Sequence, residues 1–307
     1  MSSFLVRRLL HGIVVVWGVV TAVFFLVRLT GDPVVFLVDQ SATREEIEHT
    51  RRLLGLDRPM HEQYLAFLLA VPRGDFGTSI REKRPAMGLV LERFWPATVE
   101  LALAAAVLST LLAVPLGVVA ATHKDRTADH LSRIASLLLQ SMPGFWLGLL
   151  LILLFAVELH GLLPAYGAGT WRHLILPAVA LAAAPLAQNA RLVRAGMLEV
   201  QQQDYVRTAR AKGAREYVVL YRHALKNAAI PFITVAGLSL GFMLSGTIII
   251  ETVFAWPGLG RLIVQAVPGR DFPVIQAGVF VFALIFVVLN LAVDLLYAVV
   301  DPRVRLS

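Results

Sequence analysis

The residues of this chain that could do chemistry are polar side chains set inside long apolar runs. A polar group at membrane depth is costly, so each is a candidate for contact with a solute or a gate. The same groups could also join helices by hydrogen bonds, and both readings stay open here. These candidates are Gln140, Met142, Gln188, Asn189, Glu251, Asn290 and Asp294.

The sequence context of three of these positions narrows their role. Asn290 and Asp294 stand at i and i+4, so they share one face of a helix. Glu251 follows an apolar run and precedes the turn residues 257–260, which favours either an outer gate or an interface position.

Signals for catalysis are weak. The chain has no cysteine, so thiol catalysis, thiolate metal sites and disulfides are excluded. It lacks the His-Glu-x-x-His zinc motif, and its 8 histidines are scattered. It also lacks the Gly-x-x-x-x-Gly-Lys-Ser/Thr phosphate loop, so we expect no ATP hydrolysis by this chain.

Composition indicates the setting of these residues. Of the 307 residues, 57% are hydrophobic and only 16% are charged, whereas a soluble domain has roughly 25% charged residues. The net charge of +7 does not indicate nucleic acid, because the basic residues flank apolar runs and form no stripe interleaved with aromatics. We therefore predict an all-α, polytopic membrane protein.

Six stretches are long enough to cross a hydrocarbon core about 30 Å thick, which takes roughly 20 apolar residues. The predicted spans are Leu9–Val27, Leu101–Thr122, Ile134–Val157, Leu174–Ala190, Ala228–Ile250 and Val274–Val293. Lys and Arg in the short flanking segments gather on one side, which predicts that both termini are cytoplasmic. Arg303 and Arg305 add to that side at the C-terminus.

The segment between the first two spans, roughly residues 30–96, has helical signals of its own. Thr43 followed by Glu46 has the spacing of a helix capping box. Pro59 and the turn residues 74–77 divide the segment into short pieces. We predict a small helical cap on the outer membrane face.

The cytoplasmic segment Gln203–Ile233 is too long and too helix-prone for a simple connection. Val206, Ala209 and Gly213 follow helical spacing, which predicts a small-residue face, and Gly213 allows the chain to turn into a second short helix. Two short helices joined at a glycine suit docking into a groove on a partner. The basic residues alone could equally serve only to fix topology.

This segment resembles the EAA loop of ABC-importer permeases, in which three residues separate Glu-Ala-Ala from a Gly. With Gly213 as the glycine, Arg207-Thr208-Ala209 takes the place of Glu-Ala-Ala. The version Arg-Thr-Ala-Arg-Ala-Lys-Gly is similar to the B-type subunit of the peptide/nickel branch. Further matching segments, in order, are residues 7–9, 31–33, 54–59, 74–77, 96–100, 251–260, 270–273 and 301–303.

The resemblance implies a type I ABC importer permease, with six transmembrane helices and a cytoplasmic coupling-helix loop. It implies residues 1–97 as a first helix plus outer cap, and residues 98–307 as a five-helix core with the coupling loop at about 196–227. The residues implied to couple to the ATPases are Asp204, Tyr205, Arg207, Ala209, Arg210, Lys212, Gly213 and Glu216.

The implied partners are a second, homologous permease, two cytoplasmic ATPase subunits that hold ATP and Mg, and an extracytoplasmic substrate-binding protein. The implied cargo is a di- or oligopeptide, and a nickel chelate, glutathione or another small solute is the alternative. A different class, the proton-coupled secondary transporter, would usually have internal repeats or acidic relays at the membrane centre, and neither is visible here.

Overall fold

The computed structural model describes residues 2–29, 31, 32, 34, 38, 42–53 and 55–300. The regular secondary structure of these residues is helical, apart from one isolated bridge between Thr78 and Pro85. The predicted all-α class is confirmed. Pro33, Leu54 and residues 301–307, among them Arg303 and Arg305, lie outside the described residues.

Among the described residues, five helices are long and apolar enough to cross a membrane, and a bent helix pair brings the number to as many as six. The five spans are Val6–Leu29, Ala86–Thr122, Trp171–Val200, Val235–Val253 and Phe272–Leu295. They overlap five of the six predicted stretches.

The predicted third span, Ile134–Val157, is not one continuous helix. Helix α6 (Thr127–Ser141) ends before α7 (Gly144–Ile152), and the pair is bent by 102°. Pro143 explains the break, because a proline disfavours helical backbone in the residue before it. Met142 accordingly has φ −84° and ψ 126°. The π-helix Leu153–Glu158 extends α7.

The chain divides into two compact units, and the first comprises Met1–Thr98 and Pro257–Val288. It contains α1 (Ser2–Leu29), α2 (Arg44–Leu53), α3 (Met60–Ala70), the 3-10 turn Val71–Arg73, α4 (Ala86–Arg93), the π-helix Phe94–Thr98, α12 (Leu259–Ala266) and the first part of α13 (Phe272–Val300).

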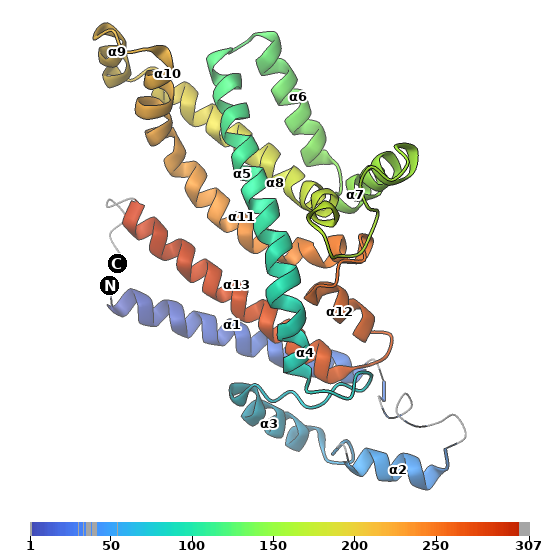
Figure 1. Cartoon of the computed structure of the whole chain (residues 1–307). Coiled ribbons are helices and arrows are strands. Elements are labelled where there is room, and N and C mark those ends of the chain that lie inside the picture. Colours follow the sequence, from blue (N-terminus) through green and yellow to red (C-terminus); the bar gives the residue numbers. More distant parts are fainter. Residues whose placement is uncertain are drawn as a thin grey trace. The chain divides into compact units, whose positions relative to one another are not determined.

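The outer segment is fastened to α1 within this unit (Figure 1). The Phe24 ring lies 5.2 Å from that of Tyr64 and 5.1 Å from that of Phe67, and the Tyr64 hydroxyl is 2.8 Å from Thr21 Oγ1. The predicted capping box is confirmed, since the Thr43 N–H donates to Glu46 Oε2 at 2.8 Å and the Glu46 N–H donates to Thr43 Oγ1 at 3.4 Å.

The second unit comprises Val99–Trp256 and Leu289–Ser307. It contains α5 (Val99–Thr122), α6, α7, α8 (Trp171–Val200), α9 (Asp204–Ala211), α10 (Glu216–Val218), the π-helix Val219–Ala224 and α11 (Leu225–Val253). Helix α8 packs on α5 and α11 (Figure 1).

Two glycines allow the close packing of this unit. A Cβ on Gly117 of α5 would lie 2.7 Å from the Ala190 carbonyl oxygen of α8. A Cβ on Gly196 of α8 would lie 2.8 Å from the Ala228 carbonyl oxygen of α11. Such close approach of backbones is typical of membrane helix contacts, and it holds α8 between its two neighbours.

Candidate coupling segment and transport pathway

The segment after α8 folds as two short helices around a glycine turn, as the sequence predicts. We call residues 204–216 the coupling segment. Helix α9 ends at Ala211, and Gly213 follows in the left-handed conformation with φ +76°. The Gly213 N–H donates to the Arg210 carbonyl at 2.9 Å and closes the last turn. A Cβ at Gly213 would meet no atom within 4 Å, so the backbone conformation, and not space, favours glycine there.

The predicted helix face formed by Val206, Ala209 and Gly213 is therefore only partly correct. Val206 is buried and Ala209 is half-buried, but Gly213 lies beyond the end of α9. The predicted start of the loop near 196 is also too early, because α8 continues to Val200.

A salt bridge braces the turn. Arg210 donates from Nη2 to Glu216 Oε1 at 2.8 Å and from Nε to Glu216 Oε2 at 3.2 Å. The hydrogen bond from Arg210 lowers the pKa of Glu216, and the same bond raises the pKa of Arg210. The brace fixes α9 relative to α10.

A second contact ties the segment to the next span. Asn227 Nδ2, in α11, donates to the Tyr205 hydroxyl at 2.7 Å. Within α9, Arg207 Nη1 lies 3.8 Å from Asp204 Oδ1. All the predicted coupling residues except Ala209 are exposed, Lys212 among them. The segment is a braced, exposed projection at one end of the second unit (Figure 1).

The predicted pathway residues come from four helices and differ in environment. Gln140 is exposed in the last turn of α6, and Met142 is half-buried at the bend. Glu251 of α11 is fully buried, while Asn290 and Asp294 of α13 are half-buried.

Gln188 and Asn189 are neighbours with opposite environments. Asn189 is buried, and its Nδ2 donates to Ser109 Oγ of α5 at 3.4 Å. Gln188 is exposed on the other side of α8. Asn189 thus joins two helices, and Gln188 is the one available to a solute.

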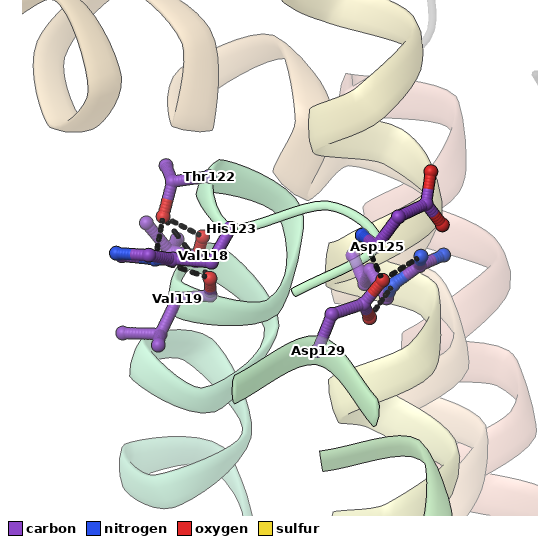
Figure 2. Close-up of polar contacts among 7 residues, drawn as sticks. Val118, Val119, Thr122, His123, Asp125 and Asp129 are labelled. Carbon is purple, nitrogen blue, oxygen red and sulfur yellow. Dashed lines mark hydrogen bonds and ion pairs between the residues drawn. The ribbon is translucent and has the colours of Figure 1, made fainter. Parts of the chain in front are cut away.

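The sequence analysis missed a buried ion pair in the second unit (Figure 2). The Asp129 carboxylate of α6 has no exposed surface and accepts two hydrogen bonds from the Arg194 guanidinium of α8, both at 2.6 Å. The Asp125 N–H donates a third at 3.0 Å. The pair fastens α6 to α8 a few residues before the coupling segment.

The turn before α6 supports this pair. Asp125 adopts the left-handed conformation with φ +59°, which Asp tolerates better than most residues. At the end of α5, Thr122 Oγ1 donates to the Val118 carbonyl at 3.0 Å, and His123 Nδ1 lies 3.1 Å from the Val119 carbonyl oxygen (Figure 2). These side chains add to the backbone bonds of the last turn, where the Val119 carbonyl also accepts the His123 N–H at 3.1 Å.

One motif known from catalysis, which we expected to be absent, does occur in the sequence. Residues 237–241 read Gly-Leu-Ser-Leu-Gly, the Gly-x-Ser-x-Gly spacing of a nucleophile elbow. That motif needs a sharp turn from strand to helix, but here it lies inside α11. Ser239 Oγ donates to the Val235 carbonyl at 2.8 Å, so the motif is part of an ordinary helix.

The spans suit a polytopic membrane protein, and the comparisons show its family. Residues 113–306 match the family described as "Binding-protein-dependent transport system inner membrane component". Residues 1–102 match its N-terminal region, described as "Binding-prot-dependent transport system membrane comp, N-term". The chain belongs to this family, and within it to the peptide/nickel branch of ABC-importer permeases.

Curated relatives are similar over their whole length. The chain is 42% identical to "Glutathione transport system permease protein GsiC" of Escherichia coli (strain K12), over 99% of both chains. The protein of that name from Pectobacterium atrosepticum is 43% identical, also over 99% of both chains. The resemblance proposed from the sequence is confirmed.

A solved structure shares the fold at low sequence identity. It is titled "Crystal structure of an amino acid ABC transporter with histidines", and the TM-score is 0.50 at 18% identity. The match covers 71% of this chain and 94% of that chain. It supports the fold class and carries no information on cargo.

Proposed function

We propose that this chain forms half of the membrane pathway of an ATP-driven importer for short peptides, with glutathione as the first cargo to test. The observation that carries the coupling role is the braced, exposed segment at residues 204–216. Val206 of α9 and Val219 after α10 are fully buried, and Arg210 bonds Glu216 across the turn, so a push on α9 would move the segment as one body.

The proposed partners follow from the family. A second, homologous permease completes the pathway, and two cytoplasmic ATPases with ATP and Mg dock on the coupling segments of the two permeases. An extracytoplasmic binding protein delivers the cargo. ATP binding would bring the ATPases together, and α8 and α11, which flank the coupling segment, would carry that motion into the membrane.

The proposed orientation places both termini and the coupling segment in the cytoplasm. It rests on the Lys and Arg residues of the short loops, among them Arg207, Arg210 and Lys212 in the coupling segment itself. The outer segment with α2 and α3 then lies on the side of the binding protein.

The proposed cargo rests on two arguments. The branch to which the chain belongs is the peptide/nickel branch, and the full-length relatives at 42–43% identity are named for glutathione transport. Glutathione is itself a tripeptide, so both arguments point to short peptides. Di- and oligopeptides of other sequence, nickel chelates and other small solutes are the alternatives.

Co-purification tests the proposed assembly. The tagged chain is expressed with its neighbouring genes, extracted in mild detergent and isolated. We expect a second permease and ATP-hydrolysing subunits in the same complex, with ATP turnover stimulated by the binding protein plus glutathione. A chain that purifies alone, and whose vesicles accumulate solute from a proton gradient, would favour the secondary transporter.

A further inference from the structure

Helix α8 differs from its neighbours in what it exposes. After Trp171 at its start, no large apolar side chain of α8 is exposed, although every residue of this helix is described. Helix α5, in contrast, exposes Leu103, Val107, Leu111 and Val119. A face toward lipid needs large apolar side chains, so the exposed face of α5 suits lipid and that of α8 does not.

Beyond Arg172, the exposed residues of α8 form one stripe. They are Ala184, Gln188, Arg191, Ala195 and Glu199, and they follow each other at i, i+4, i+7, i+11 and i+15. This spacing places them on a single helix face, which we call the open face. The opposite side of the helix packs against α5 and α11, with Val193 and Met197 fully buried.

Arg191 and Arg194 have opposite roles on this helix. Arg194 is engaged in the buried pair with Asp129. Arg191 is exposed and, in the part of the chain that the structure describes, has no acidic partner. A free guanidinium beside an amide offers the forked donors that carboxylates bind best.

The depth of the stripe follows from helix geometry. An exposed Trp171 suits the outer interface, where tryptophans of membrane proteins gather. At about 1.5 Å per residue, Arg191 is about 30 Å further along, at the inner limit of the hydrocarbon core. Gln188 and Ala184 then lie inside the core, where the only water is that of a pathway.

We infer that the open face of α8 lines the water-filled route through the importer, and that Arg191 and Gln188 bind the cargo's carboxylate near its cytoplasmic end. The inference rests on the proposed function and deepens it, because it assigns the cargo a chemical class, a carboxylate-bearing solute. Peptides and glutathione belong to that class.

Cysteine accessibility tests the lining, because every cysteine introduced into this cysteine-free chain is its single thiol. Ala184→Cys is compared with Leu111→Cys on the exposed apolar face of α5, both in the assembled complex in inside-out vesicles. Hydrophilic methanethiosulfonates should modify the α8 thiol at least about tenfold faster than the α5 thiol. Equal, slow modification at both sites would place the open face against lipid or the partner permease and overturn the inference.

The charge of Arg191 is tested in the Ala184→Cys variant, because a reagent added at the cytoplasmic side reaches this thiol only past Arg191. An anionic methanethiosulfonate (sulfonatoethyl) is compared with a cationic one (trimethylammonioethyl), each normalised to its rate with a free thiol. Replacing Arg191 with Gln should lower the anion-to-cation ratio about tenfold, and replacing it with Lys should preserve the ratio. An unchanged ratio in the Gln variant would mean that Arg191 does not act on the route.

Uptake then tests the carboxylate role. With glutathione as the probe, Arg191→Gln should slow uptake by about 10- to 100-fold, as expected for loss of a charge-assisted hydrogen bond. Arg172→Gln, an exposed arginine at the other end of α8, is the control and should leave uptake unchanged. Equal uptake by both variants would refute the carboxylate site. If the unaltered complex imports no glutathione, the proposed cargo fails while the labelling results still decide the lining.

Discussion

The ion pair between Asp129 and Arg194 should be the most sensitive polar contact of the second unit. Loss of one member of a buried ion pair costs about 3–5 kcal/mol, because the other charge is left without compensation. In Arg194→Ala the fully buried Asp129 carboxylate keeps only the Asp125 N–H as a donor. We therefore expect the full cost for this variant.

The reverse change should cost less. The Arg194 side chain is 20% exposed, so in Asp129→Ala its guanidinium can turn toward water, and we expect a loss of about 1–3 kcal/mol. The double variant should resemble Asp129→Ala, because no buried charge remains. The two effects should therefore be non-additive by about 3–5 kcal/mol, the whole cost of Arg194→Ala.

Thermal unfolding followed by tryptophan fluorescence measures these differences, with all variants in the same detergent and at one scan rate. A unit of 150–250 residues shifts its Tm by about 2–4 °C per kcal/mol, so Arg194→Ala should melt roughly 6–20 °C lower. A Tm within about 2 °C of the parent, or strictly additive effects, would refute the reasoning that the pair is buried and fastens α6 to α8.

Three further predictions concern the second unit. Gly213→Val should uncouple ATP hydrolysis from uptake while the protein stays in the membrane, because φ +76° is strained for a β-branched residue. Gly213→Asn tolerates that backbone conformation and should retain coupling. Normal uptake by the Val variant would contradict the docking role. The brace between Arg210 and Glu216 should add less than about 1 kcal/mol, since both groups are partly exposed. Because the pKa of Glu216 is lowered in the fold, the stabilisation from this brace is present above the unfolded-state pKa of about 4.3 and is lost as pH falls below it. Hydrogen exchange of residues 204–216 should become faster over that pH range, and the Glu216→Gln variant should lack this pH dependence. Gly117→Val should destabilise the contact of α5 with α8, because a Cβ at this position would lie 2.6 Å from Val193 Cβ. An unchanged Tm would contradict this prediction and would mean that the two helices separate at little cost.

Local features of the fold were predictable from the sequence. The capping box of Thr43 and Glu46 depends on residues three positions apart, and the turn at Gly213 depends on one glycine. Both are confirmed, since short-range geometry decides them. The break of the third span at Pro143 was not predicted, because the apolar run continues through it and hydropathy alone does not register a bend.

Contacts between distant residues were beyond sequence reasoning. Asp129 and Arg194 are 65 positions apart, and each has the appearance of a residue at a cytoplasmic helix end. Gln188 and Asn189 were treated alike because they are neighbours, yet a helix turns about 100° per residue, so the structure buries one and exposes the other. The face of α8 that packs on α5 is decided by tertiary packing, which the local sequence does not reveal.

Uptake into proteoliposomes that contain the purified complex tests the central claim most directly. Labelled glutathione is supplied with the binding protein, and vesicles with ATP at the coupling-segment side are compared with ATP-free vesicles under an imposed proton gradient. We predict uptake that requires ATP, the ATPase subunits and the binding protein, and that is unaffected by dissipation of the gradient. Uptake of glutathione or any other peptide by this chain without ATPase subunits, driven by the proton gradient, would contradict the claim.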